Sequence, residues 1–176
     1  MMEPRSKKPS ILLLLLVFAV FIAVVVWAGT AVSTDDALWF LPIFPENASS
    51  YILYWDGEEI LLEPGTAGYA QMNEAFQEEL TGVRAHPNGV GLSDVMLEHL
   101  QDAGRLVEAQ YAEPARVHCR YRFGASPVLY VPLSGYHAWN NRVFNLGRGS
   151  PLELDSTDRI MAAAEEIVVG AGAGSP

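Results

Sequence analysis

The sequence contains a single cysteine, Cys119, and contains no lysine after Lys8. One cysteine excludes an intramolecular disulfide and a tetrahedral cysteine metal site, so an apolar core must hold the fold together. The chain from residue 30 to residue 176 is long enough to build such a core in one ordinary domain.

Basic residues are scarce along the whole chain, which has 11 Lys and Arg against 21 Asp and Glu. Three of the basic residues, Arg5, Lys7 and Lys8, and one acidic residue, Glu3, lie in the first nine positions. The remainder carries only arginine as a basic residue, and its formal charge is about −12. Nucleic acid and anionic lipid headgroups repel such a domain, so we expect no nucleic-acid partner.

The motifs of common catalytic and metal sites are also missing from the sequence. There is no His-Glu-x-x-His sequence, no pair of histidines at i and i+4, and no Gly-x-Ser-x-Gly elbow. Two short Gly-x-Gly sequences, at 89–91 and 147–149, lack the other positions of a nucleotide-binding loop. We therefore predict no catalytic residue, no metal ligand and no cofactor.

What the sequence does contain is an uncharged apolar run that begins at Ile11 and ends at Ala28. As a helix it would extend about 27 Å, close to the hydrocarbon thickness of a bilayer. The basic residues before the run, and Asp35 and Asp36 after it, predict a cytoplasmic N-terminus and an exported C-terminal part. We expect a single-pass protein of the cell membrane, held in the lipid bilayer by this run. The alternative is a cleaved signal peptide, because residues 29–31 are small enough for a signal peptidase.

The predicted domain organisation follows from the apolar run. The segments are a basic cytoplasmic N-terminus (1–9), a transmembrane signal-anchor helix (10–29), a juxtamembrane linker (30–50), an extracytoplasmic domain (51–169) and a disordered Gly-rich tail (170–176). The linker contains prolines that break helices, and it carries an apolar strip at Trp39, Phe40 and Phe44. We expect this strip to pack on the domain, to lie at the membrane interface or to bind a partner.

The pattern after residue 50 predicts an α+β domain with a mainly antiparallel sheet covered by about three helices. The dipeptide Asp56-Gly57 between two apolar segments predicts a two-residue hairpin turn. The register of this hairpin would pair Tyr51 with Leu62, Leu53 with Ile60, and Trp55 with Glu58. Further helices are expected over 67–80, 94–103 and 157–169, and further strands over 105–111, 117–123, 128–131 and 152–154. A second hairpin is expected over 136–146.

One arrangement supports a hypothesis about a site. Four residues alternate with apolar positions and would share one face of a strand: Arg116, His118, Arg120 and Arg122. Aligned like charges repel each other unless something negative lies opposite, and guanidinium groups suit carboxylate and phosphate. We expect this face to bind an anionic ligand or an acidic partner segment, or to pair with carboxylates of the domain itself. Such carboxylates are available at Glu108, Glu113 and Glu153.

Together these features favour a non-enzymatic binding or accessory domain at the outer membrane face, attached to a larger protein complex of the membrane. One alternative is an extracytoplasmic sensor of an anionic ligand. A second is a hydrolase that uses the loop from Ser134 to His137, with Asp155 as the third member of a triad.

Overall fold

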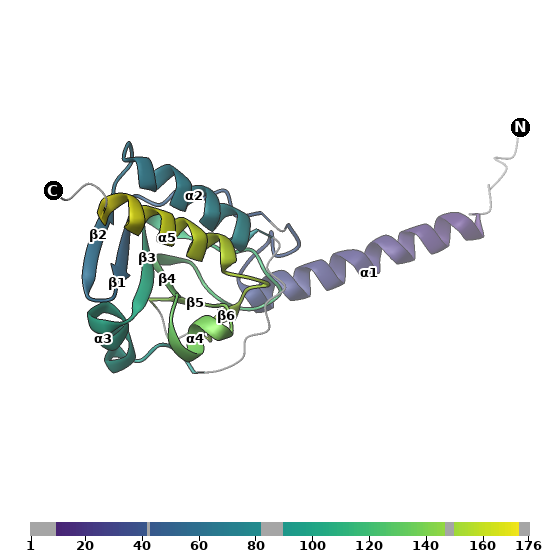
Figure 1. Cartoon of the computed structure of the whole chain (residues 1–176). Helices are drawn as coiled ribbons and strands as arrows, with labels where there is room; N and C mark the ends of the chain where they lie inside the picture. The colour runs from purple at the N-terminus through teal and green to yellow at the C-terminus, as the bar shows by residue number, and fades with distance from the viewer. Residues whose placement is uncertain (1–9, 42, 82–89, 147–149, 173–176) are drawn as a thin grey trace, which may run out of the picture.

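The structure is a computed structural model and describes residues 10–41, 43–81, 90–146 and 150–172. These residues form five helices and six strands, and the predicted α+β class is confirmed. The first helix, α1, projects from one end of the molecule, and the other elements gather around a single sheet (Figure 1).

Helix α1 (Ile11–Thr34) contains 24 residues and extends about 36 Å. Within the described ranges it is the one helix that is long and apolar enough to cross a membrane. The helix continues past residue 29, where the sequence predicted its end. The Thr34 hydroxyl donates to the Thr30 carbonyl oxygen at 2.8 Å, so the polar side chain is satisfied within the helical backbone. The first part of the predicted linker is therefore helical.

The sheet is antiparallel and has the strand order β2-β1-β3-β4-β5-β6. Its strands are β1 (Ser50–Trp55), β2 (Glu58–Leu62), β3 (Arg105–Ala115), β4 (Ser126–Pro132), β5 (Arg142–Asn145) and β6 (Leu152–Glu153). The long strand β3 lies at the centre, where it pairs with β1 on one side and β4 on the other.

The hairpin of β1 and β2 has the predicted register, with Tyr51 opposite Leu62, and Trp55 opposite Glu58. Its turn works because Asp56 and Gly57 both adopt positive φ angles, 52° and 90°. These angles are those of a type I′ turn, whose twist matches that of the strands.

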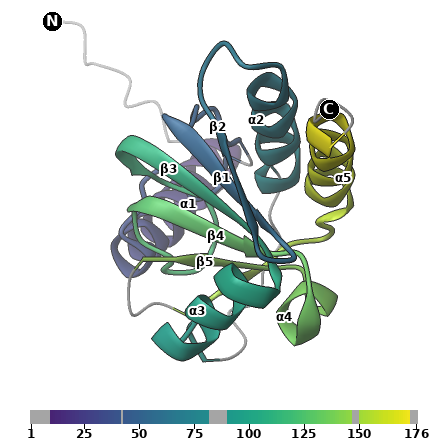
Figure 2. The same cartoon turned by 60° about the vertical axis from the view of Figure 1, so that its left-hand side comes forward.

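Helices cover both faces of the sheet. Helix α2 (Ala67–Leu80) and helix α5 (Asp158–Gly172) pack side by side on one face, and they enclose the larger part of the core (Figures 1 and 2). Helix α3 (Asp94–Ala103) lies on the opposite face, where Leu100 joins a smaller cluster with Leu106 and Phe144. The short helix α4 (Gly135–Trp139) precedes β5 on the same side as α3 (Figure 2).

Helix α4 corrects one prediction, because residues 136–139 are not the first arm of a hairpin. Gly135 has a φ of 73°, which turns the chain sharply after β4. The turn directs the next residues away from β4 and into one turn of helix, and the chain then returns to the sheet as β5.

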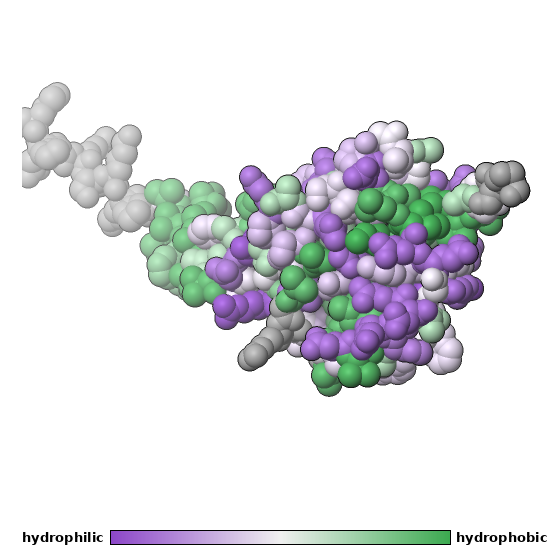
Figure 3. Space-filling model, turned by 90° about the vertical axis from the view of Figure 1, so that its left-hand side faces the viewer, coloured by the Kyte–Doolittle hydropathy of each residue, from purple (hydrophilic) through white to green (hydrophobic). Residues whose placement is uncertain are grey.

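The surface of the domain differs from that of α1. The face shown in Figure 3 is mostly hydrophilic, with separate hydrophobic patches, whereas the visible part of α1 is almost continuously hydrophobic. Large side chains of α1 are exposed along most of its length, from Ile11 to Trp27. Exposing such a surface to water is unfavourable, and the described part of the domain does not cover it.

Candidate functional site

The predicted basic strand is not a strand. Strand β3 ends at Ala115, and the residues from Arg116 to Ala125 form no ladder before β4 begins. Ala115 already pairs with Ser126, so the intervening residues leave the sheet as a long loop and have no neighbouring strand. The alternation itself is retained, because Val117, Cys119 and Phe123 are buried while Arg120 and Arg122 are exposed. An extended loop with one covered face produces this pattern as well as a strand does.

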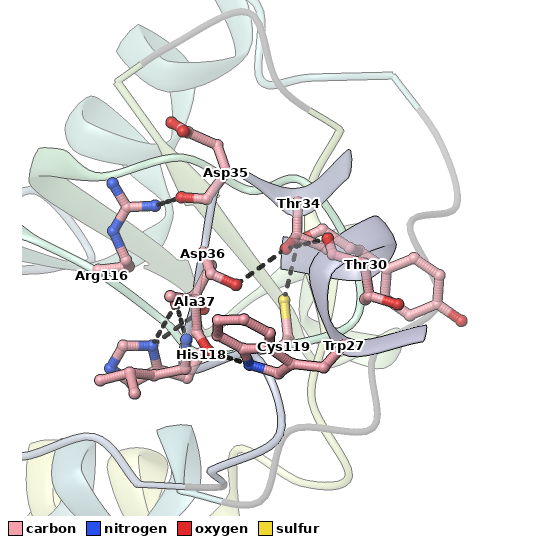
Figure 4. Close-up of polar contacts among 11 residues, drawn as sticks. Trp27, Thr30, Thr34, Asp35, Asp36, Ala37, Arg116, His118 and Cys119 are labelled. Carbon is pink, nitrogen blue, oxygen red and sulfur yellow. Dashed lines mark hydrogen bonds and ion pairs between the residues drawn. The ribbon is translucent and has the colours of Figure 1, made fainter. Parts of the chain in front are cut away.

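The basic face of this loop contacts the chain segment that follows α1, as Figure 4 shows. Nδ1 of His118 lies 2.9 Å and 3.1 Å from the two carboxylate oxygens of Asp36. The Arg116 guanidinium donates to the backbone carbonyl of Asp35. The side chains of His118 and Asp36 are 11% and 7% exposed, so this contact is shielded from solvent. Asp36 is therefore the partner of His118, and Arg116 bonds to a backbone carbonyl. In the described part of the chain, Glu108, Glu113 and Glu153 form no ion pair with this face.

The end of α1 is itself tightly folded. Asp35 adopts the left-handed conformation, with a φ of 57°, and the next residue, Asp36, donates its backbone N–H to the Ala31 carbonyl at 3.1 Å. The Trp27 indole N–H donates to the carbonyl of Ala37 at 3.0 Å, so the chain after the helix lies back against its last turns. We call the contacts of residues 34–37 with Trp27, Arg116 and His118 the junction. It joins α1 to the domain through polar contacts rather than through a free linker.

The apolar strip divides between the core and the surface. Phe44 is buried and packs edge-on against Tyr111, with ring centroids 6.2 Å apart. Trp39 is partly buried, and its ring lies 5.8 Å from the Arg120 guanidinium carbon, within the range of a cation–π contact. Phe40 is 51% exposed. Of the three positions, Phe44 therefore belongs to the domain and Phe40 faces outward beside the junction.

The residues of the proposed hydrolase loop do not assemble into a triad. The Ser134 hydroxyl oxygen accepts a hydrogen bond from the backbone N–H of Arg105 at 2.9 Å. His137 lies on α4, and its Nδ1 faces Arg142 rather than Ser134. The hydrogen bond at Asp155 involves its backbone carbonyl, which accepts from the side-chain amide of Asn141, and not its carboxylate. Over the described part of the chain, no three His, Cys, Asp or Glu side chains gather as a metal site would require.

The structure adds a candidate site that the sequence does not indicate. Arg142, the first residue of β5, is only 7% exposed and borders a cavity of about 400 Å³. Burial, and secondarily the charge of Arg142, lower the pKa of His137 below its usual range. The sequence does not indicate this position, because an arginine in a four-residue strand is usually exposed and nothing in the sequence shows that this one is buried.

No protein-family model, no curated protein and no solved structure matches this chain. The function must therefore be argued from the fold, the junction and the cavity themselves.

Proposed function

We propose that this protein is a single-pass membrane protein whose exported α+β domain is a non-enzymatic binding or accessory module, held at the outer face of the membrane. The length and apolar surface of α1 support the anchor. The basic residues Arg5, Lys7 and Lys8 before the helix support an N-terminus inside the cell.

The observation that carries the proposal is the junction. A domain that only needed export would be expected to follow a flexible linker, whereas here Asp36 and His118 fasten the domain to the last turn of α1. Such an attachment gives the domain a fixed orientation relative to the helix, and therefore to the bilayer in which the helix would lie. Fixed orientation is useful to a module that must meet a partner or ligand at a defined height above the membrane.

Three exposed apolar side chains beside the junction support the same placement. Leu38, Phe40 and Ile43 are each 44% to 51% exposed and follow closely after the end of α1. Aromatic and aliphatic side chains at this position suit the headgroup region of a bilayer, where amphipathic rings are favoured. In this proposal these three side chains rest on the lipid interface or on a protein partner within the membrane.

A reporter fusion tests this proposal. An enzyme that is active only outside the cytoplasm is fused after Pro176, and the full-length chain is expressed in a bacterial host. We expect reporter activity, with the intact chain remaining in the membrane fraction after alkaline extraction. A control fusion that lacks residues 10–34 should be inactive. A soluble exported product beginning near Val32 would contradict the anchor. If a second fusion, to a reporter that is active only in the cytoplasm, were the active one, the orientation would be contradicted.

A further inference from the structure

The cavity at the start of β5 contains a buried cation without a carboxylate partner. Arg142 is almost fully buried, and its Nε atom has no hydrogen-bond partner. Among the described residues, the ion pairs join Arg105 to Asp56, His118 to Asp36 and Arg159 to Glu78, and Arg142 belongs to none of them. Glu153 is opposite Arg142 in the strand register, yet it forms no ion pair with it. Burying a charge without an opposite charge is costly, so this arrangement calls for an explanation.

The two contacts that Arg142 does make are weak. One guanidinium nitrogen lies 3.4 Å from Nδ1 of His137, and the guanidinium carbon lies 5.3 Å from the centre of the Tyr136 ring. A guanidinium group can only donate, so Nδ1 of His137 must be the acceptor, and the ring proton then resides on Nε2. The lowered pKa of His137 agrees with this neutral ring. Neither contact neutralises the positive charge of Arg142.

The cavity is open to solvent on one side, because Val90 and Tyr136 in its wall are 84% and 65% exposed. Its volume of about 400 Å³ falls within the usual range for such pockets. Arg142 and His137 meet Val90, Met96 and Tyr136 in its walls, so a charged end and an apolar body would both be accommodated. Ser93, at the N-terminal cap of α3, completes the lining; its oxygen accepts from the Met96 N–H, and its hydroxyl proton can point toward a ligand.

We propose that this cavity binds a small organic monocarboxylate with an apolar body, whose carboxylate pairs with Arg142. One guanidinium group balances one negative charge, and no second cation lines the described cavity. The strongly acidic character of the domain disfavours a dianion such as phosphate, because the surrounding field repels the second charge. The inference rests on the proposal that the domain is a binding module, and it names the class of ligand.

Calorimetric titration of the full-length protein in phosphatidylcholine nanodiscs tests the inference, with benzoate as the probe. Benzamide is a neutral analogue of nearly the same shape, and inorganic phosphate is a dianion at the pH of the experiment. We expect saturable binding of benzoate with one site per chain, and no saturable binding of benzamide or phosphate. Empty nanodiscs supply the blank for partition into lipid.

Three variants locate the site. Arg142→Met should weaken benzoate binding at least tenfold, whereas Arg122→Gln removes an equal charge from an exposed position and should leave the affinity within twofold. Met96→Trp fills the cavity and retains Arg142, so it should also weaken binding at least tenfold even if Arg142→Met fails to fold.

Three results would overturn the inference. The first is no binding of benzoate up to about 20 mM, a concentration at which even millimolar affinity would be detected. The others are unchanged benzoate binding in Met96→Trp and equal binding of benzamide. These failures differ from a failure of the proposed membrane role, because the reporter fusion tests location and the titration tests only the cavity. If the reporter is inactive but benzoate binds, the ligand site is supported and the proposed exported location is contradicted.

Discussion

At the scale of single residues, the alternation of basic and apolar side chains from Arg116 to Phe123 correctly predicted which side chains are buried, although the backbone there is a loop and not the predicted strand. The pattern separates buried from exposed positions, and it predicts that something negative lies opposite the basic face. The separation of buried from exposed positions agrees with the structure. Opposite the face, His118 contacts the carboxylate of Asp36, whereas among the described residues its three arginines form no ion pair. The partner was not foreseen because Asp36 is 82 residues away in sequence and no local signal links the two segments.

Cys119 gives a prediction at this scale. The side chain is buried, its thiol donates to the Tyr121 carbonyl at 3.3 Å, and burial raises the pKa of the thiol above its usual value. Because the thiolate is the reactive form, we expect native protein at pH 8 to resist iodoacetamide by at least tenfold relative to unfolded protein. Mass spectrometry after timed alkylation, with and without guanidinium chloride, measures this ratio. Equal labelling in both states would show that the loop from 116 to 125 opens freely.

At the scale of elements, the sequence predicted best where local chemistry decides the structure. The Asp56-Gly57 turn and the helices over 67–80 and 94–103 depend on neighbouring residues, and each has its predicted position. The predicted strand over 117–123 was wrong because a strand also needs a partner, and β4 pairs with β3 only as far as Ala115. Helix α4 was missed because one helical turn is too short to show periodicity.

Two glycines offer a matched test of element stability. Gly57 has a φ of 90°, and a Cβ there would lie 3.3 Å from the Asp102 carbonyl, so Gly57→Ala should destabilise the domain by about 1–2 kcal/mol. Gly170 lies in α5 with open space around it, and Gly170→Ala should stabilise by a few tenths to about 1 kcal/mol. Urea unfolding of the two variants measures both changes. A neutral effect of Gly57→Ala would show that the turn can relax without loss.

At the scale of the whole molecule, the candidate sites lie in two different places. The basic face that the sequence pointed to belongs to the junction, where it contacts the chain's own segment after α1. Arg142, the buried arginine without a carboxylate partner, lies apart from the junction, in the cavity between α3, α4 and β5. Neither location could be derived from the sequence, because each depends on contacts between segments that only the folded chain brings together.

The junction leads to the last prediction, which separates a docked domain from a tethered one. A free linker over residues 35–44 would be cut rapidly by chymotrypsin after Trp39 or Phe40. Here backbone and side-chain contacts hold residues 36–41: Asp36 bonds to His118, and the Leu41 N–H donates to the Leu38 carbonyl at 2.8 Å. The full-length chain in nanodiscs should therefore resist cleavage at these positions. Gel analysis of the early cleavage products measures the rate.

Asp36→Asn replaces a carboxylate with an amide of the same shape and so weakens the charge-assisted contact with His118. A loss of about 1.4 kcal/mol in the free energy of local opening would raise the cleavage rate about tenfold, provided that reclosing is faster than cleavage. Arg122→Gln, a charge change on the same loop at an exposed position, should leave the rate unchanged. Rapid cleavage of the unmodified chain, or equal rates for the unmodified chain and Asp36→Asn, would mean that the domain hangs from α1 on a flexible segment. The fixed orientation on which the proposed function depends would then be lost.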